Sequence, residues 1–222
     1  PIERKALPPI DVVLITHDHY DHLEAQTMRH LADKATHFVT TLGVGARLQS
    51  CNVPPEKITE LGWGDSTEIN GVKYTAEPTV HYSRRNRDDR NKTLWAAFVL
   101  EGAGKRIYWS GDSGYGKHFV EAGKKYGGFD IAFMEIDAAN PGWANTHMFP
   151  EEAVQATQDV NARIMLPIHW GVFNLGRNPW DESIRRAAAA ATTKGVRMDM
   201  PKMGEKYTPD THRQENWWEG IQ

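Results

Sequence analysis

Two hydrophobic patterns recur along the chain. Short continuous apolar runs predict strands, and apolar residues at helical spacing predict helices. The run at residues 12–15, Val-Val-Leu-Ile, predicts a buried strand, and the apolar positions of residues 23–33 have helical spacing. Residues 66–69 and 72–77 predict a hairpin, because Asn70-Gly71 between them tolerates the positive φ angles of a tight turn.

The same patterns continue to the carboxyl end of the chain. Further strands are expected at residues 38–40, 94–100, 106–110, 131–136, 164–168 and 196–200. Further helices are expected at residues 43–49, 117–126 and 182–193, and from Pro150 onward, where proline is tolerated in a first turn. Strands that first pair in hairpins and later alternate with helices indicate layered α+β structure, which we assign to a single domain over residues 1–222.

Composition narrows the class of protein. The chain has 222 residues, a quarter of them charged, and a formal net charge of −3, which argues against a general nucleic-acid-binding protein. No apolar run reaches membrane-spanning length and no secretory signal is visible, so the expected location is the cytoplasm or the periphery of a membrane. The single Cys51 excludes an intrachain disulfide framework.

A dense group of possible metal ligands directly follows the first predicted strand, in the sequence His17-Asp18-His19-Tyr20-Asp21-His22. Imidazole and carboxylate groups at this spacing are ligands for a divalent ion of intermediate softness such as zinc. In an extended turn, His17 and His19 fall on one side and hold one ion, while Asp21 and His22 hold a second ion where the helix starts. A polar, exposed turn is the plain alternative, but three histidines among six residues make it a poor explanation.

Three further positions share one placement, at the carboxyl end of a predicted strand or in the turn after it. They are His81, Asp112 and His169. Each has an ordinary explanation when taken singly, as a structural histidine or a turn aspartate. Because the same placement recurs in a chain that already carries the first motif, metal ligation is the better hypothesis for all three.

The order of these residues resembles the ligand pattern of the metallo-β-lactamase-fold hydrolases. Longer stretches are similar to N-acylphosphatidylethanolamine-hydrolysing phospholipase D and its bacterial relatives. They are His81-Tyr82-Ser83-Arg84-Arg85, Leu94-Trp95, Gly111-Asp112-Ser113-Gly114-Tyr115, Pro150-Glu151-Glu152-Ala153-Val154 and Ile168-His169-Trp170-Gly171-Val172-Phe173. The resemblance runs from about Pro9 to Phe173.

This resemblance implies an αββα sandwich with two Zn²⁺ ions at one edge, Mn²⁺ and Fe²⁺ being the alternatives. It also implies the ligand sets: His17, His19 and His81 for one ion, Asp21, His22 and His169 for the other, and Asp112 as the bridge. A water molecule activated by the two metals would attack a phosphodiester. The family's fold has several strands before the first metal motif that are missing here, so we expect the chain to be a fragment or the ordered core of a longer protein.

The candidate catalytic residues are Asp21, Tyr20 and His147. His147 matches a family position near the substrate phosphate, where it would bind the phosphate or donate a proton to the leaving group; its alternative is an ordinary loop histidine. The Tyr20 phenol would reach the reacting oxygen or only pack. Asp18 and Asp130 are candidates to orient ligand imidazoles, or are ordinary turn and strand-end carboxylates.

The remaining charged and histidine residues have weaker assignments. Arg84, Arg85, Arg87 and Arg90 would grip a phosphate headgroup, or, because Asp88 and Asp89 interrupt them, belong to a solvated loop with internal pairing. Surface or structural roles are assigned to His30, His37, His118 and His212.

Three functions remain open at this point. The leading one is a zinc-dependent, phospholipase D-like hydrolase of a small-molecule or lipid phosphodiester. The alternatives are a lactone or ester hydrolase of the same fold, and a metal-stabilised, non-catalytic envelope-associated module, although seven candidate ligands exceed the four that a structural zinc needs. No nucleic-acid partner is expected, and the sequence is compatible with peripheral membrane contact and with a dimer.

Overall fold

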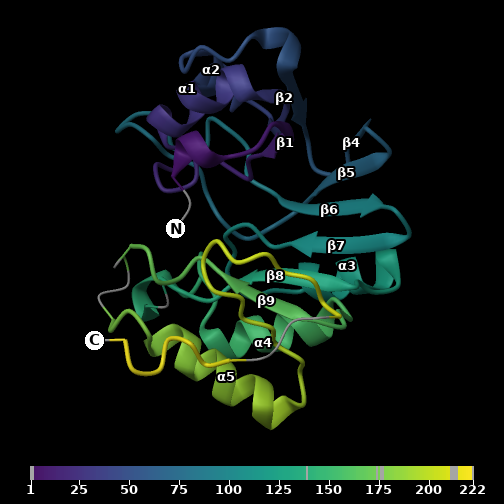
Figure 1. Ribbon diagram of the computed structural model, residues 1–222, viewed down its shortest axis with the longest axis vertical. Coiled ribbons are helices and arrows are strands. Elements are labelled where there is room, and N and C mark those ends of the chain that lie inside the picture. Colours follow the sequence, from purple (N-terminus) through teal and green to yellow (C-terminus); the bar gives the residue numbers. More distant parts are fainter. Residues whose placement is uncertain (1–2, 139, 174, 176–177, 211–214, 222) are drawn as a thin grey trace. The chain divides into compact units, whose positions relative to one another are not determined.

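The chain forms two compact units, residues 2–104 and residues 105–222, which we call the amino-terminal and the carboxyl-terminal unit. The computed structural model describes residues 3–138, 140–173, 175, 178–210 and 215–221 (Figure 1). Among these residues, no helix combines the length and the apolar character that crossing a membrane requires.

The amino-terminal unit contains a parallel sheet in the order β1-β2-β3. Its strands are β1 (Ile10–Leu14), β2 (Ala35–Thr41) and β3 (Ile58–Leu61). Helix α1 (Ala25–Lys34) connects β1 to β2, as the crossover between parallel strands demands. Between β2 and β3 lie α2 (Gly45–Gln49) and the short 3-10 helix η2 (Pro55–Lys57); a further short 3-10 helix, η1 (Arg4–Ala6), precedes β1.

The core of this unit lies between the parallel sheet and α1. Met28 and Leu31 of α1 are buried against Phe38 of β2 and against Leu23, the last apolar residue before the helix. Helix α1 begins only at Ala25, because the Glu24 carboxylate caps it by accepting hydrogen bonds from two free N–H groups of its first turn, those of Gln26 and Thr27. The cap at Glu24 and the packing of α1 therefore define where the preceding turn, residues 17–22, ends.

A second, antiparallel group of strands follows in the same unit. It consists of β4 (Ser66–Ile69), β5 (Val72–Glu77) and β6 (Ala97–Gly102). The predicted hairpin is confirmed: Ile69 pairs with Val72, and Asn70 and Gly71 have φ angles of 52° and 76°. The strand predicted to start at Leu94 starts instead at Ala97, because the N–H groups of Leu94 and Ala96 bind the carbonyls of Leu42 and Thr16.

The carboxyl-terminal unit contains a parallel arrangement of β7 (Lys105–Trp109), β8 (Ile131–Glu135) and β9 (Met165–Ile168). The connections carry α3 (His118–Tyr126) and α4 (Pro150–Asp159), with the short 3-10 helix η3 (Pro141–Trp143) before α4. Helix α5 (Glu182–Lys194) follows β9 and packs against α4. Because parallel strands end at the same edge, this topology brings the turns after β7, β8 and β9 close together.

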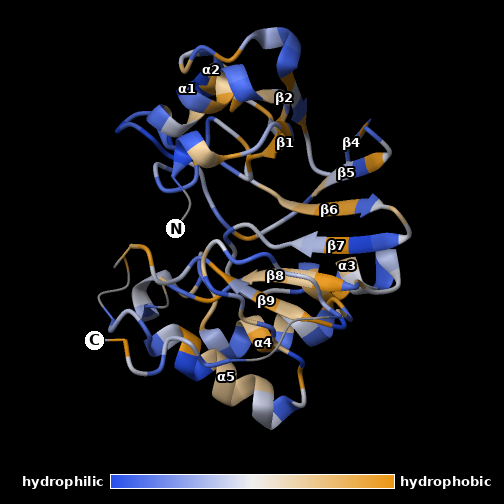
Figure 2. Cartoon of the chain, viewed as in Figure 1, coloured by the Kyte–Doolittle hydropathy of each residue, from blue (hydrophilic) through white to orange (hydrophobic). Residues whose placement is uncertain are grey.

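Burial in the carboxyl-terminal unit follows the apolar pattern of the sequence. Figure 2 shows β8 and β9 as mostly hydrophobic, and Met134, Met165 and Ile184 are fully buried. The strand predicted at residues 196–200 is reduced to one isolated bridge between Met165 and Met198.

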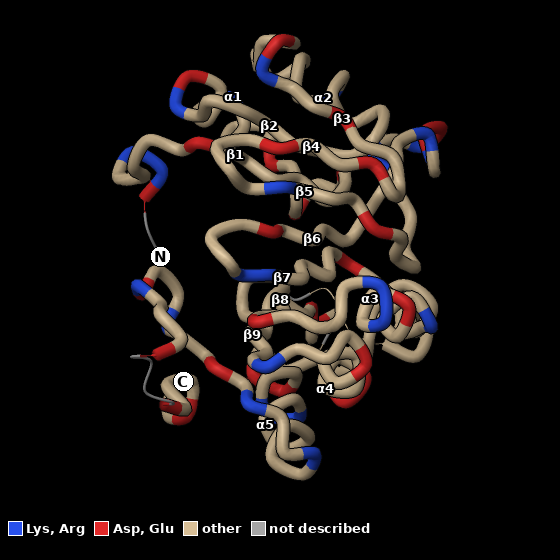
Figure 3. Tube along the Cα trace, turned by 90° about the vertical axis from the view of Figure 1, so that its right-hand side faces the viewer, with Lys and Arg blue, Asp and Glu red and all other residues tan. Residues whose placement is uncertain are grey.

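Charged side chains of both signs are distributed along the elements of each unit. In Figure 3, positions of Lys and Arg and positions of Asp and Glu are scattered over helices, strands and turns.

Candidate metal centre

The turn between β1 and α1 carries the first histidine-rich motif. His17 and Asp18 are buried. The carbonyl of His19 accepts hydrogen bonds from the N–H groups of His22 and Leu23, which closes the turn. Nε2 of His17 and Nδ1 of His19 lie 3.0 Å apart.

His81 reaches the same place from the segment after β5. Its Nε2 lies 3.3 Å from Nδ1 of His19, and one ring nitrogen of each of His17, His19 and His81 lies within 4.8 Å of the others. The structure therefore brings these three residues together. Three convergent imidazole nitrogens are a donor set that suits Zn²⁺ or a related divalent ion.

Asp21 and His22 form a second pair on the same turn. Oδ2 of Asp21 lies 3.5 Å from Nε2 of His22, and the His22 ring lies 4.1 Å from the His17 ring. The turn therefore presents a carboxylate and an imidazole beside the three-histidine set.

Tyr20 is placed differently from its neighbours. It is 62% exposed, and the Arg85 guanidinium lies 4.1 Å from the centroid of its ring. This cation–π contact matches the packing alternative for Tyr20.

The arginine-rich loop after His81 contacts the main chain of the histidine-rich turn. The side chain of Arg85 donates hydrogen bonds to the carbonyls of Asp18, His19 and Leu23, at 2.7, 3.4 and 2.9 Å. Arg85 is thus engaged with the turn itself. For Arg85, this contact with the main chain of the turn differs from both explanations given for the loop, a phosphate grip and pairing within the loop.

Asp89 anchors that loop. Its carboxylate accepts hydrogen bonds from the N–H groups of Asn86 and Arg85, at 2.7 and 3.0 Å, and from the guanidinium of Arg47, at 2.6 Å. These donors, the Asn86 N–H first among them, lower the pKa of Asp89 to about 2. Arg47 also contacts the buried Asp18, at 3.4 Å, so the loop and the turn share one network of charges.

A second cluster of titratable side chains lies at the carboxyl ends of the strands of the carboxyl-terminal unit. Its members are Asp112 after β7, Glu135 at the end of β8, His147 before α4 and His169 after β9; one polar atom of each lies within 4.8 Å of the others. Nε2 of His169 is 3.5 Å from Oδ2 of Asp112. His169 has a φ of 63°, in the left-handed region that histidine tolerates better than most residues.

Glu135 is the member that sequence analysis missed. Its side chain is fully buried, and its carboxylate accepts hydrogen bonds from the N–H groups of Ser113 and Met148, while Oε2 lies 3.0 Å from Nδ1 of His147. The available signal was its position, because Glu135 ends an apolar strand just as the recognised candidates do. Burial raises the pKa of the Glu135 carboxyl.

His147 therefore belongs to the cluster and is not an isolated loop residue. Burial alone would lower its pKa, but the Coulombic attraction and the hydrogen bond of Glu135 outweigh burial, so the pKa of His147 is raised.

Asp130, in contrast, lies at the opposite end of β8. It accepts a hydrogen bond from the Arg106 N–H and pairs with Lys105 and Arg163, so it is the strand-end carboxylate of the two alternatives given for it. His212 lies outside the described residues.

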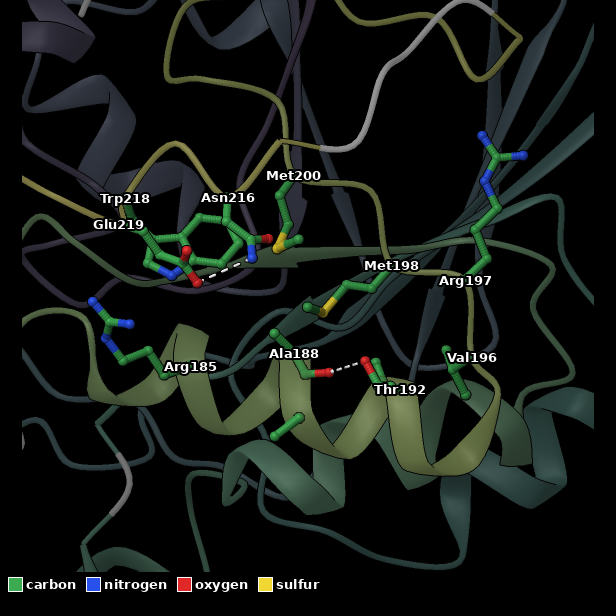
Figure 4. A pocket seen from close by; sticks show the side chains of 12 residues that line it. Arg185, Ala188, Thr192, Val196, Arg197, Met198, Met200, Asn216, Trp218 and Glu219 are labelled. Atoms are coloured by element: carbon green, nitrogen blue, oxygen red, sulfur yellow. Dashed lines mark hydrogen bonds between the residues drawn. The ribbon is translucent and has the colours of Figure 1, made fainter.

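A cavity of about 440 Å³ opens elsewhere in the carboxyl-terminal unit, between α5 and the chain after it (Figure 4). Met198, Met200, Trp218 and Thr192 line it. None of the candidate metal ligands contributes to it.

Comparison with known proteins gives the family. Residues 1–170 match the Beta-lactamase superfamily domain. An uncharacterized protein of Mycobacterium tuberculosis is 40% identical over 223 residues, which cover 98% of this chain and 60% of that protein. N-acyl-phosphatidylethanolamine-hydrolyzing phospholipase D 1 of Caenorhabditis elegans is 32% identical over 188 residues, which cover 79% of this chain and 53% of the enzyme. The chain thus spans about 60% or less of the length of these relatives.

A solved structure agrees with this match. Igni18, a metallo hydrolase from the archaeon Ignicoccus hospitalis, has a TM-score of 0.68 over 90% of this chain and 81% of its own, at 20% identity, which bears on the fold alone. The α+β fold class predicted from the sequence is confirmed, and the fold family together with the histidine and aspartate clusters supports a divalent-metal site. The chain belongs to the β-lactamase superfamily and has the metallo-β-lactamase fold.

Proposed function

We propose that this chain is a zinc-dependent phosphodiesterase of the phospholipase D type, which cleaves a phosphodiester in a phospholipid-like molecule. One observation carries the proposal: a buried, charge-paired histidine, His147, lies beside the candidate ligands Asp112 and His169. Support for the substrate class comes from the relative in C. elegans, whose name gives N-acyl-phosphatidylethanolamine as its substrate.

The proposed metal ligands are the seven residues identified in the sequence. They are His17, His19, Asp21, His22, His81, Asp112 and His169. When bound, two Zn²⁺ ions would supply Lewis acidity, which stabilises negative charge on phosphoryl oxygens and makes water a stronger acid.

The chain's own residues position that chemistry. Arg85 holds the turn that carries His17 to His22, through three main-chain carbonyls. His147 acts as the proton donor to the leaving-group oxygen, and the charge and hydrogen bond of Glu135, which raise the pKa of its imidazole against the effect of burial, favour the protonated form. Asp21 acts as a ligand and Tyr20 packs on Arg85 beside it.

The test is hydrolysis by the zinc-loaded protein of three substrates: bis(4-nitrophenyl) phosphate, a simple lactone and 4-nitrophenyl acetate. We expect turnover of the phosphodiester and a loss of roughly 10²- to 10⁴-fold in kcat for His147→Ala, as for removal of a general acid. His30→Ala is the matched control, because the His30 ring binds the Arg4 carbonyl at the amino end of the chain.

The other outcomes separate the alternatives. Turnover of only the lactone or the ester would replace the proposal with an acyl hydrolase of the same fold. Bound zinc without turnover of any of the three would favour a metal-stabilised module without catalysis.

A further inference from the structure

The carboxylate of Glu135 joins three segments that are far apart in the sequence. Oε1 accepts hydrogen bonds from the N–H groups of Ser113, at 2.9 Å, and of Met148, at 3.1 Å. Oε2 lies 3.0 Å from Nδ1 of His147. Ser113 follows the candidate ligand Asp112 directly, and Met148 follows His147, so one fully buried side chain ties both positions to the end of β8.

The direction of these hydrogen bonds is fixed by the chemistry of the groups. Both partners of Oε1 are main-chain N–H groups, which can only donate. Burial disfavours the charged form of Glu135, but the two N–H groups on Oε1 and the neighbouring imidazole of His147 favour it. An ionised carboxylate accepts hydrogen bonds and donates none, so with Glu135 ionised it is Nδ1 of His147 that carries the proton in the contact with Oε2. With Nδ1 protonated in both the neutral and the cationic ring, Nε2 is the nitrogen through which His147 gains and loses a proton.

We propose that Glu135 is the positioning residue of His147: it fixes the orientation of the imidazole and keeps a proton on Nδ1, so that His147 exchanges its proton with the substrate through Nε2. The catalytic part of this inference rests on the phosphodiesterase function proposed above. The assignment of the tautomer does not, because it follows from the hydrogen bonds of an ionised Glu135.

Glu135→Gln is the sharpest test, because the amide keeps the shape of the carboxylate and changes one hydrogen-bonding group. The Gln carbonyl must face the two N–H groups of Ser113 and Met148, since two donors cannot be met by an NH₂ group. The NH₂ group then faces His147, and Nδ1 has to become an acceptor. We therefore expect the proton of neutral His147 to move from Nδ1 to Nε2.

The first measurement is the ¹⁵N NMR spectrum of the histidine rings in the zinc-loaded protein. His147 is assigned by the signal that disappears in His147→Ala. We expect protonated Nδ1 in the wild type and in Glu135→Asp, which keeps a carboxylate, and protonated Nε2 in Glu135→Gln. An unchanged tautomer in Glu135→Gln would overturn the proposal, and this result does not depend on any substrate being found.

The second measurement is kinetic and uses a double mutant. We expect Glu135→Gln to lower kcat by about 10- to 100-fold, the usual range for residues that orient a functional histidine, with little change in KM. In the His147→Ala background the same substitution should lower kcat no further, because Glu135 acts through His147. A full additional loss in the double mutant would overturn the proposal.

Zinc content separates positioning from direct ligation. Glu135 lies in a cluster whose polar atoms are close enough to share an ion, so its carboxylate is also a candidate ligand. We expect Glu135→Gln to bind as much zinc as the wild type. Loss of one zinc equivalent with an unchanged His147 tautomer would assign Glu135 to the metal instead. Should Glu135→Gln fail to fold, Glu135→Asp decides: a protonated Nδ1 with a reduced kcat supports positioning, and an unprotonated Nδ1 contradicts it.

Discussion

The side chain of Arg85 donates a hydrogen bond of 2.7 Å to the main-chain carbonyl of Asp18, in the middle of the turn that carries the first four candidate ligands. The same guanidinium nitrogen reaches the carbonyls of His19 and Leu23. Arg85, 67 positions from Asp18 in the sequence, therefore connects its own loop to the main chain of this turn.

Replacing Arg85 should therefore loosen the turn. We expect Arg85→Gln to lower the free energy of unfolding by roughly 1.5 to 3 kcal/mol, the usual contribution of hydrogen bonds to a charged group. Zinc affinity should fall by about 10-fold, because the donor atoms of His17 and His19 are no longer held in place. Urea unfolding and zinc competition against a chelator measure the two effects.

Arg87→Gln is the matched control in the same loop, because the Arg87 side chain is exposed. Its stability and zinc affinity should stay at the wild-type values. Equal effects of the two substitutions would mean that the loop's net charge matters and the contacts of Arg85 do not.

The lowered pKa of Asp89, in the same loop, predicts that the stability of the protein depends on pH in the acid range. Its pKa is about 2 in the folded chain against 3.8 for an ordinary aspartate, chiefly because the Asn86 N–H binds its carboxylate. A lowered folded-state pKa means that the carboxylate stabilises the protein fully above pH 3.8, and that this stabilisation is lost as the pH falls toward 2. Asp89→Asn should therefore be less stable than the wild type at neutral pH, and the difference should shrink toward pH 2.

The measurement compares unfolding of the two proteins at neutral pH and across the acid range. Asp88→Asn serves as the control, because Asp88 is the exposed neighbour of Asp89. A difference between Asp89→Asn and wild type that stays constant down to pH 2 would show that the loss comes from packing and not from the charge.

The sequence predicted the ligand-bearing segments because their signals are local. An apolar run followed by His17-x-His19-x-Asp21-His22 places the motif after a strand, and β1 does end at Leu14. The hairpin at Asn70-Gly71 was predictable for the same reason, since the φ angles are a property of the two residues themselves.

What the sequence did not predict depends on contacts between distant segments. The role of Arg85 is invisible in a loop of mixed charges, because only the folded chain brings it to Asp18. Glu135 looks like an ordinary strand residue until its three hydrogen-bond donors arrive from two other segments. Strand β3 (Ile58–Leu61) was also missed, because its pairing with β2 is non-local.

The lowered pKa of His118 predicts a second pH dependence of stability, which comes from a buried base instead of a hydrogen-bonded acid. It is partly buried at the start of α3, with its Nε2 3.1 Å from Oγ of Ser113, and burial lowers its pKa from 6.5 to about 4. Between these two pH values the unfolded chain binds a proton that the folded chain does not, so stability rises with pH in this window and is complete above 6.5. The full effect is on the order of 2 to 3 kcal/mol.

The measurement is the free energy of unfolding of wild type and His118→Gln at several values between pH 4 and pH 7.5. We expect the stability of the variant relative to the wild type to increase as the pH falls, because glutamine has no proton to bind. A pH-independent difference between the two proteins would contradict this origin of the pKa shift.

Gly123 allows the close contact between α3 and α4. A Cβ atom on Gly123 would lie 2.3 Å from the carbonyl oxygen of Asp159 and 3.1 Å from the main chain of Val160. In an exposed helix, glycine to alanine stabilises by about 1 kcal/mol. Here the obstacle is main chain, which cannot rotate away, so we expect Gly123→Ala to destabilise by roughly 1 to 3 kcal/mol, as overpacking does. Thermal and urea unfolding measure the change, and Lys124→Ala, on the exposed face of the same helix, should leave stability within about 0.5 kcal/mol of wild type. If Gly123→Ala were as stable as the wild type, the two helices would have to separate easily at this point, and glycine would not be required for their packing.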